Sequence, residues 1–152
     1  MQVVLALLMG IVAGLRAMTA PAVASWAGYV GRLSLASTPL AFMGSWWVPW
    51  LFTALALAEL VTDQLPTTPS RKVPMQLGAR IVTGALAGAT IAATGASLAA
   101  GAAAGAVGAV IGTFGGAAFR ARLAVFFGED RPAAFIEDAI AIIGALLIVS
   151  LA

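Results

Sequence analysis

The sequence predicts an all-α integral membrane protein in which about five transmembrane helices form one bundle, with residues 1–152 as a single domain. Hydrophobic residues make up 62% of the chain, and only 9% of its residues are charged. The apolar runs approach the roughly 20 residues that a helix needs to cross a hydrocarbon core. They show no apolar/polar alternation, which excludes the strands of a membrane barrel.

The five predicted spans cover residues 3–23, 46–63, 79–98, 100–119 and 132–151. The segment between the first two spans contains an apolar patch at residues 39–43 that is too short to cross a membrane. We therefore expect residues 33–45 to form a re-entrant or surface-lying segment.

The first span begins with an apolar stretch over residues 1–14, and its first cation, Arg16, follows that stretch. A secretory signal places its positive residues before the apolar part, so this span is predicted to be retained. Pro21 removes a backbone hydrogen bond near the Ala17 carbonyl, which predicts a kink or an unwound turn. Two interpretations fit: Arg16 and Thr19 face a polar cavity, or Arg16 is paired with a carboxylate at an ordinary kink.

The second span ends with Glu59 and Asp63, which are four residues apart and so lie on one helix face. Two carboxylates at this spacing repel, and they require a cation, a proton or arginine partners. We predict that Glu59 pairs with Arg16, because the second span returns beside the first. The polar segment after this span, 64–76, contains three prolines that prevent the helix from continuing, and its cations favour contact with lipid headgroups.

The third and fourth spans carry stripes of small residues that allow two helix backbones to approach closely. We predict that these two spans make the closest helix contact in the protein, and this interpretation is favoured over a ligand groove. The predicted packing residues are Gly84, Gly88, Gly105, Gly108 and Gly112.

The fifth span has Pro132 in its first turn, where a missing N–H does no harm, and carries Glu137 and Asp138 further inside. Adjacent helical residues point about 100° apart, so the two carboxylates are predicted to face different partners. One is expected to face the bundle and the other to turn toward Arg120, Arg122 or Arg131.

Most of the basic residues fall on one side of the predicted bundle. The residues on this basic side are Arg71, Lys72, Arg80, Arg120, Arg122 and Arg131. The opposite side has one basic residue, Arg32, and all four tryptophans. The positive-inside rule then predicts an inner-membrane protein with its N-terminus in the cytoplasm and its C-terminus outside. Spans 1–2 and 4–5 also predict a faint inverted pseudo-repeat.

The chain contains neither cysteine nor histidine, which excludes disulfides, thiolate catalysis and the usual zinc sites. No enzyme chemistry and no cofactor are predicted, and the sequence leaves a metal undefined. Because the basic residues lie beside membrane segments, they indicate orientation, and nucleic acid is not an expected partner.

Two functions remain open from the residues alone. One is a transporter or channel-like protein, expected to be a homodimer in the bilayer, that handles an ion or small polar solute through intramembrane polar residues. The other is a membrane scaffold or lipid-associated protein in which the same charges are structural ion pairs. The candidate ion-binding or substrate-binding residues are Arg16, Thr19, Glu59, Asp63, Glu137 and Asp138.

Four segments of the chain resemble a bacterial membrane family known only as domain of unknown function 4126. They are residues 14–21 (GLRAMTAP), 59–71 (ELVTDQLPTTPSR), 79–80 and 137–138. The resemblance covers nearly the whole chain and implies a small multi-span protein of the bacterial inner membrane. It implies no activity and no site residues.

Overall fold

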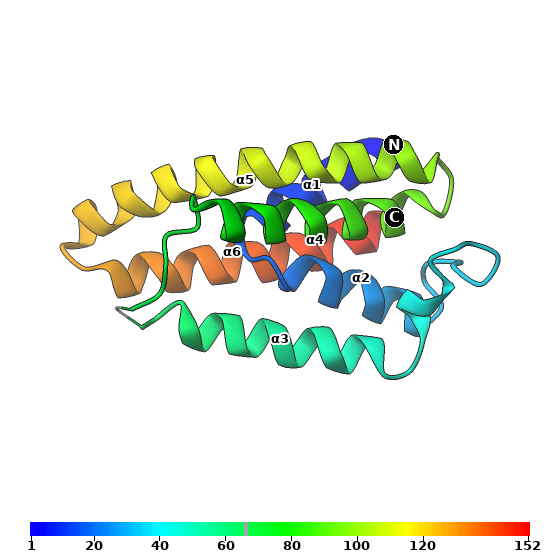
Figure 1. Cartoon of the computed structure of the whole chain (residues 1–152), viewed down its shortest axis with the longest axis horizontal. Coiled ribbons are helices and arrows are strands. Elements are labelled where there is room, and N and C mark those ends of the chain that lie inside the picture. Colours follow the sequence, from blue (N-terminus) through cyan, green and yellow to red (C-terminus); the bar gives the residue numbers. More distant parts are fainter. Residues whose placement is uncertain (66) are drawn as a thin grey trace.

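The computed structural model describes residues 1–65 and 67–152, and within them it is all helical (Figure 1). Pro66, one of the three prolines noted above, lies outside the described residues. The elements are α1 (Gln2–Leu15), α2 (Thr19–Tyr29), the 3₁₀ helix η1 (Ala41–Gly44), α3 (Val48–Thr62), α4 (Pro74–Ala92), α5 (Leu98–Phe127) and α6 (Asp130–Leu151). The predicted all-α fold class is confirmed.

The helix ends follow from local sequence signals. Pro49 and Pro74 lie in the first turns of α3 and α4, where a helix has no use for their missing N–H groups. The Ser97 side chain caps α5 by accepting a hydrogen bond from the backbone N–H of Ala100. Gly128, with φ at +72°, ends α5 in the left-handed conformation that glycine adopts without strain.

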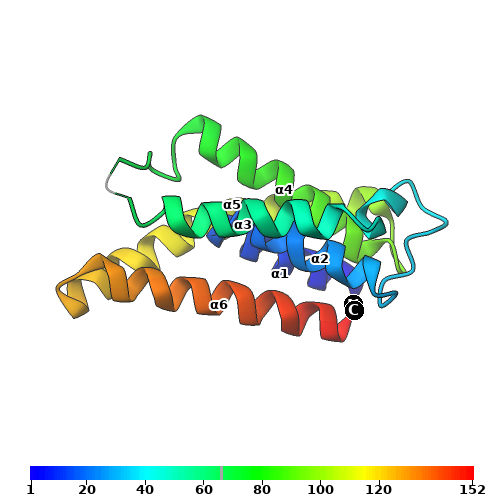
Figure 2. The ribbon, with the colours of Figure 1, turned by 90° about the horizontal axis from the view of Figure 1, so that it is seen from below.

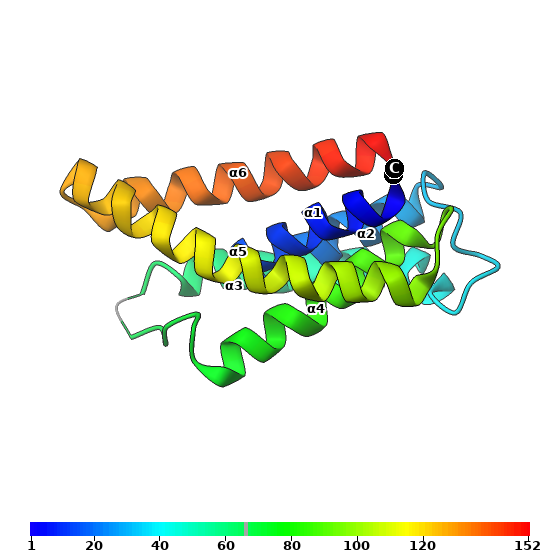
Figure 3. The ribbon, with the colours of Figure 1, turned by 90° about the horizontal axis from the view of Figure 1, so that it is seen from above.

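The predicted first span is a pair of helices that fold back on each other. Arg16 has extended backbone after α1, and α2 begins at Thr19 and returns to the end of the bundle from which α1 started (Figures 1 and 3). Hydrogen bonds fix both outer ends near the C-terminus: Gln2 Nε2 donates to the Ala152 carbonyl and Arg32 Nη2 to the Ser150 carbonyl, each at 3.2 Å. The break predicted near Ala17 is confirmed, but residues 3–23 form two helices that fold back on each other and not the single span that was predicted.

Pro21 explains why a helix can restart after this break. It lies in the first turn of α2, where the N–H groups have no intrahelical acceptor and proline therefore loses nothing. In the sequence, Pro21 falls inside the predicted first span, where a kink or an unwound turn is expected.

Because the chain reverses at Arg16, the N-terminus lies at the end of the bundle opposite the one that the sequence predicts. Both termini lie at one end of the bundle, and the α5–α6 turn and the loop before α4 lie at the other (Figures 1 and 2). The N-terminus is therefore remote from Arg71 and Arg120, and the prediction that it shares a side with the basic loops is wrong. The α1–α2 pair has no counterpart in α5, which is continuous over 30 residues, so the inverted pseudo-repeat gains no support.

The glycine stripe of α5 packs against two helices. A Cβ on Gly105 would overlap the Gly84 carbonyl of α4, whereas one on Gly108 would overlap the Leu7 carbonyl of α1. Contact between α1 and α5 is more extensive than contact between α4 and α5. Gly84, Gly88 and Gly105 pack closely between α4 and α5, as predicted, but Gly108 and Gly112 face α1, so the α4–α5 contact is not the most extensive one.

Residues 33–45 form a cap at the end of the bundle that holds the two termini. Their only helix in the structure is η1, and the side chains of Leu33, Leu35 and Met43 are buried. Gly44 lies against the backbone of Gly28 in α2. This segment lies over the end of the bundle and does not enter it.

The bundle buries charges and exposes large apolar side chains. Arg16, Arg80 and Glu137 are buried, whereas α6 presents Ile143 and Leu147 outward. By length and composition, two of the helices in the described residues, α5 and α6, are long and apolar enough to cross a membrane. Helices α1 and α3 are apolar but shorter.

Candidate functional site

Five of the six carboxylates of the chain meet four arginines in one half of the bundle. The arginines come from the α1–α2 break (Arg16), the loop before α4 (Arg71), α4 (Arg80) and α5 (Arg120). The carboxylates come from α3 and its end (Glu59 and Asp63) and from α6 (Asp130, Glu137 and Asp138). The fold therefore brings most of the carboxylates and half of the basic side chains of the chain into this network.

Arg16 is fully buried at the break and has two carboxylate partners. Its Nε donates to Asp138 Oδ1 at 2.5 Å, and its Nη1 lies 2.8 Å from Asp63 Oδ2. The two terminal nitrogens of Arg16 lie close to carboxylate oxygens but form no well-aligned hydrogen bond. Their contacts are therefore mainly electrostatic. The predicted pair with Glu59 is wrong, because Glu59 binds elsewhere.

Glu59 and Arg80 satisfy the two broken helix ends. The carboxylate of Glu59 accepts the backbone N–H groups of Ala17 at 2.8 Å and Met18 at 2.9 Å, just before α2. Arg80 Nη1 donates to the last carbonyls of α1, Gly14 and Leu15, both at 2.9 Å. These contacts match the charge at each helix end, since a helix favours an anion at its N-terminus and a cation at its C-terminus.

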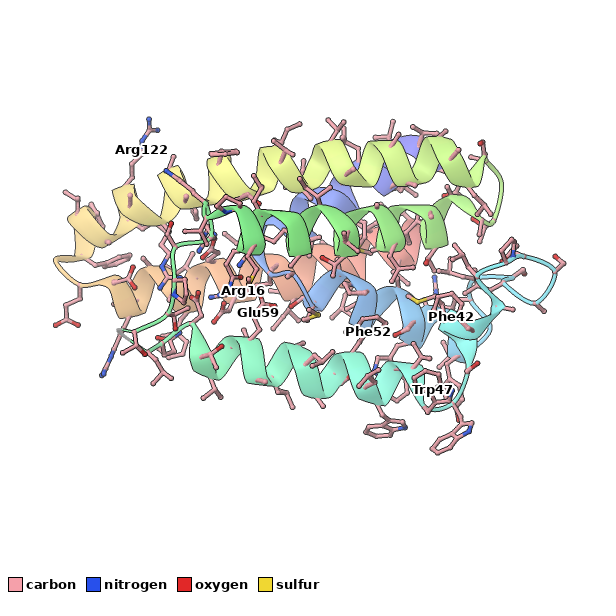
Figure 4. The ribbon with its side chains drawn as sticks, viewed as in Figure 1. Arg16, Phe42, Trp47, Phe52, Glu59 and Arg122 are labelled. Carbon is pink, nitrogen blue, oxygen red and sulfur yellow. The ribbon has the colours of Figure 1, made fainter. Side chains whose placement is uncertain are left out.

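The same two side chains also contact each other, with Arg80 Nη2 at 3.4 Å from Glu59 Oε1. Figure 4 shows Glu59 beside Arg16 in the middle of the bundle, next to the interruption between α1 and α2. The irregular backbone at the break is thus satisfied by a carboxylate and a guanidinium of the protein.

Arg71 reaches from its loop to Glu137 on α6. Its Nη1 and Nη2 lie 2.5 and 2.8 Å from the two carboxylate oxygens of Glu137, which is itself fully buried. The pair passes over Gly116 of α5, where a Cβ would lie 3.1 Å from Glu137 Oε1 and 3.3 Å from Arg71 Nη1. Glycine at this position therefore leaves the space that the pair occupies.

Arg120 joins the network to the end of the bundle. It contacts Asp63, donates to Asp130 Oδ1 at 2.9 Å, and lies 3.6 Å from Glu137 Oε2. Asp130, at the first residue of α6, is 60% exposed and lies outside the apolar part of that helix. Its hydrogen bond with Arg120 lowers the pKa of its carboxyl. The expectation that Glu137 and Asp138 face different partners is met, with Arg71 and Arg120 on one side and Arg16 on the other.

A polar cavity of about 490 Å³ opens beside this network. It lies between the end of α3, the loop before α4, the start of α4 and the middle of α5. Glu59, Asp63, Arg80 and Arg120 form part of its wall. Arg16 does not line it and is sealed behind Asp63, so the predicted site residues divide between a cavity wall and a closed ion pair.

Thr19 is buried at the start of α2 and lines no part of the cavity. Neither Arg71 nor Arg80 was among the predicted site residues. For Arg80 a signal existed, since it lies inside the predicted span 79–98, whereas nothing in the loop sequence distinguishes Arg71. In the described part of the chain, no group of three or more carboxylates is arranged to hold a metal ion.

Residues 3–152 match the family described as "Domain of unknown function (DUF4126)". No curated protein and no solved structure matches the chain. Because the match extends over almost the whole chain, the protein belongs to this family.

Proposed function

We propose that this member of the family is a membrane protein that moves an ion or small polar solute across the bilayer. Its distribution of side chains supports a membrane setting, because charges are enclosed and large apolar residues face outward along α3, α5 and α6. In this proposal α3, α4, α5 and α6 cross the membrane, and the α1–α2 pair enters and leaves on one side.

The positive-inside rule now gives a different orientation for the N-terminus. The end of the bundle with the basic loops is cytoplasmic, and the opposite end, with Trp46, Trp47 and both termini, is outside. Figure 4 labels Trp47 at the end remote from Arg122, as an aromatic belt at the outer interface would require. The network then lies in the cytoplasmic half of the membrane.

One observation carries the transport proposal: the open, charged cavity ends at the interruption between two half helices. Broken helices at membrane depth supply unpaired backbone groups that bind solutes in many transporters. Here Glu59 and Arg80, which line the cavity, occupy those groups. Beyond the break, Gly10 and Gly14 lie against α5 so closely that neither has room for a Cβ. In this proposal the cavity is open toward the end of the bundle with the basic loops, and the contact of α1 with α5 closes the path toward the other end.

Flux in proteoliposomes tests the proposal. Purified protein is reconstituted, and the movement of inorganic phosphate, acetate, sodium and potassium is followed. We expect at least one probe to move faster than in protein-free vesicles, and Thr62→Trp, which fills the cavity wall, to abolish that flux.

The matched control is Val61→Trp on the same helix, since Val61 is exposed and does not line the cavity. It should leave the flux unchanged. Protein that is folded and reconstituted but moves none of the probes would contradict transport.

The second candidate function is a membrane scaffold. It is favoured by the balance of the buried charges, because four arginines enclose four buried or half-buried carboxylates and Arg16 is closed to solvent. Such a neutral cluster holds helices together without a ligand. The homodimer expected from the sequence stays a prediction, since a single chain is described.

A further inference from the structure

We infer that the cavity binds a small oxyanion, a phosphate or carboxylate group that is either free in solution or part of a lipid headgroup. The inference rests on the proposed function where it names the solute that is carried, but binding can be measured without transport. Three features of the cavity support it: the net charge of its wall, the donors of the wall that remain free, and the position of Arg71 on a loop.

The wall of the cavity is positively charged overall. Four cations line it, Arg71, Lys72, Arg80 and Arg120, against three carboxylates, Glu59, Asp63 and Asp130. A cavity with partly apolar walls concentrates ions of the opposite sign, so this one draws anions.

All three carboxylates of the wall already have partners. Asp63 contacts Arg16 and Arg120, Asp130 is held by Arg120, and Glu59 accepts two backbone N–H groups and faces Arg80. A cation entering the cavity would have to take a carboxylate from an arginine. The wall therefore offers a cation no free ligand.

The free groups of the wall are hydrogen-bond donors. In the described residues, neither the Lys72 ammonium nor the Gln76 amide has a side-chain partner, and both line the cavity. The Ser70 hydroxyl accepts the backbone N–H of Lys72 at 3.3 Å, so its own proton is available to a ligand. A cluster of ammonium, amide and hydroxyl donors matches the oxygens of a phosphate or carboxylate.

Arg71 can add a further contact because it is the only arginine of the network that comes from a long loop. An oxyanion that binds one side of its guanidinium competes with Glu137 for the donors. Arg120 Nη1, 3.6 Å from Glu137 Oε2, would then compensate the charge of Glu137. The exchange leaves no buried carboxylate without a cation, which keeps its free-energy cost low.

Calorimetric titration of the purified full chain in a neutral detergent tests the inference, with inorganic phosphate at constant ionic strength. We expect saturable binding that Lys72→Gln weakens by about tenfold, because a hydrogen bond to a charged partner is lost. Arg122→Gln is the matched control, since it removes the same charge from an arginine that points away from the cavity (Figure 4) and does not line it. It should leave the affinity unchanged.

Equal effects of the two substitutions, or no saturable binding of phosphate or acetate, would overturn the inference. The source of the oxyanion is distinguished in nanodiscs. If a lipid headgroup is the ligand, the weakening of phosphate binding in phosphatidylglycerol relative to phosphatidylcholine is larger for the wild type than for Lys72→Gln, because the substitution also weakens the competing headgroup; if a free anion is the ligand, the weakening comes from the surface charge alone and is the same for both proteins. Both of these results support an oxyanion site.

The same measurements separate this inference from the proposed function. Phosphate binding without flux of any probe supports the site and contradicts transport. Flux of sodium or potassium without phosphate binding supports transport and contradicts the oxyanion site.

Discussion

The two halves of the bundle are held together by different interactions. The half with the basic loops contains all the ion pairs found among residues 1–65 and 67–152, and it surrounds an open cavity. The other half is held by backbone contact between α1, α4 and α5 at glycines such as Gly88 and Gly108, and its one cation is Arg32. An ion pair can exchange partners, whereas two backbones in contact cannot separate slightly without losing their packing.

This difference indicates where the molecule can change shape. A rearrangement that admits a solute would exchange partners among Arg16, Arg71 and Arg120, while the glycine contacts keep α1, α4 and α5 together. The α1–α2 break lies at the border between the two halves, and Glu59 and Arg80 close it. The break is therefore the point where an exchange of ion pairs could affect helix position.

Removal of Arg16 should have the largest effect on the ionic half. Arg16→Ala leaves Asp138 without its cation, and we expect it to lower the free energy of unfolding by about 3–5 kcal/mol. The double change with Asp138→Ala should cost less than the sum of the two single changes, with a coupling of about 1–3 kcal/mol. Denaturant unfolding in detergent measures both.

The control cycle pairs Arg16→Ala with Glu59→Ala, whose carboxylate binds Arg80 and the break instead. Its coupling should be smaller. A larger coupling to Glu59 than to Asp138 would restore the pair that the sequence predicted and contradict the structure.

Gly108→Leu should disrupt the close-packed half. A side chain at Gly108 would collide with the Leu7 carbonyl and the Ile11 backbone, so we expect a loss of about 1–3 kcal/mol and a lower Tm in detergent. Gly115→Leu is the matched control on the same helix, because nothing lies within 4 Å of a Cβ there. Equal effects on Tm would mean that the α1–α5 contact does not hold the fold together.

Asp130→Asn should have the smallest effect, because the Asp130 side chain is 60% exposed and water screens its pair with Arg120. We expect a loss of about 0.2–1 kcal/mol at pH 7. Since the pKa of Asp130 is lower in the folded state, its contribution is present above the ordinary value of 3.8 and is lost as the pH falls through the folded value. The Tm difference between wild type and Asp130→Asn should therefore begin to narrow as the pH falls below about 4. A difference that does not narrow between about pH 4 and about pH 2 would show that packing, and not charge, is responsible.

Several features of this protein are fixed by local sequence. The length and apolar composition of the hydrophobic runs predict helices, because backbone N–H and C=O groups in an apolar setting must form hydrogen bonds within their own segment. The helix break near Ala17 follows from Pro21, because a proline acts on the turn that precedes it. The close contact of α4 and α5 follows from the stripes of small residues along each helix, which include Gly84, Gly88 and Gly105. The set of charged side chains that need partners is also evident from their depth in the predicted spans.

Only the tertiary structure decided what those residues contact. The direction of the chain after Arg16 depends on the helices against which α2 packs. Because α2 runs back beside α1, the N-terminus lies at the end of the bundle opposite the predicted one. The choice of Asp138 and Asp63 over Glu59 as partners of Arg16 depends on how α3 and α6 lie around the break, and the role of Arg71 depends on where its loop crosses Gly116. The local sequence shows which charges are buried and therefore require a partner. Several carboxylates meet this requirement equally well, and only the packing of distant segments determines which of them becomes the partner.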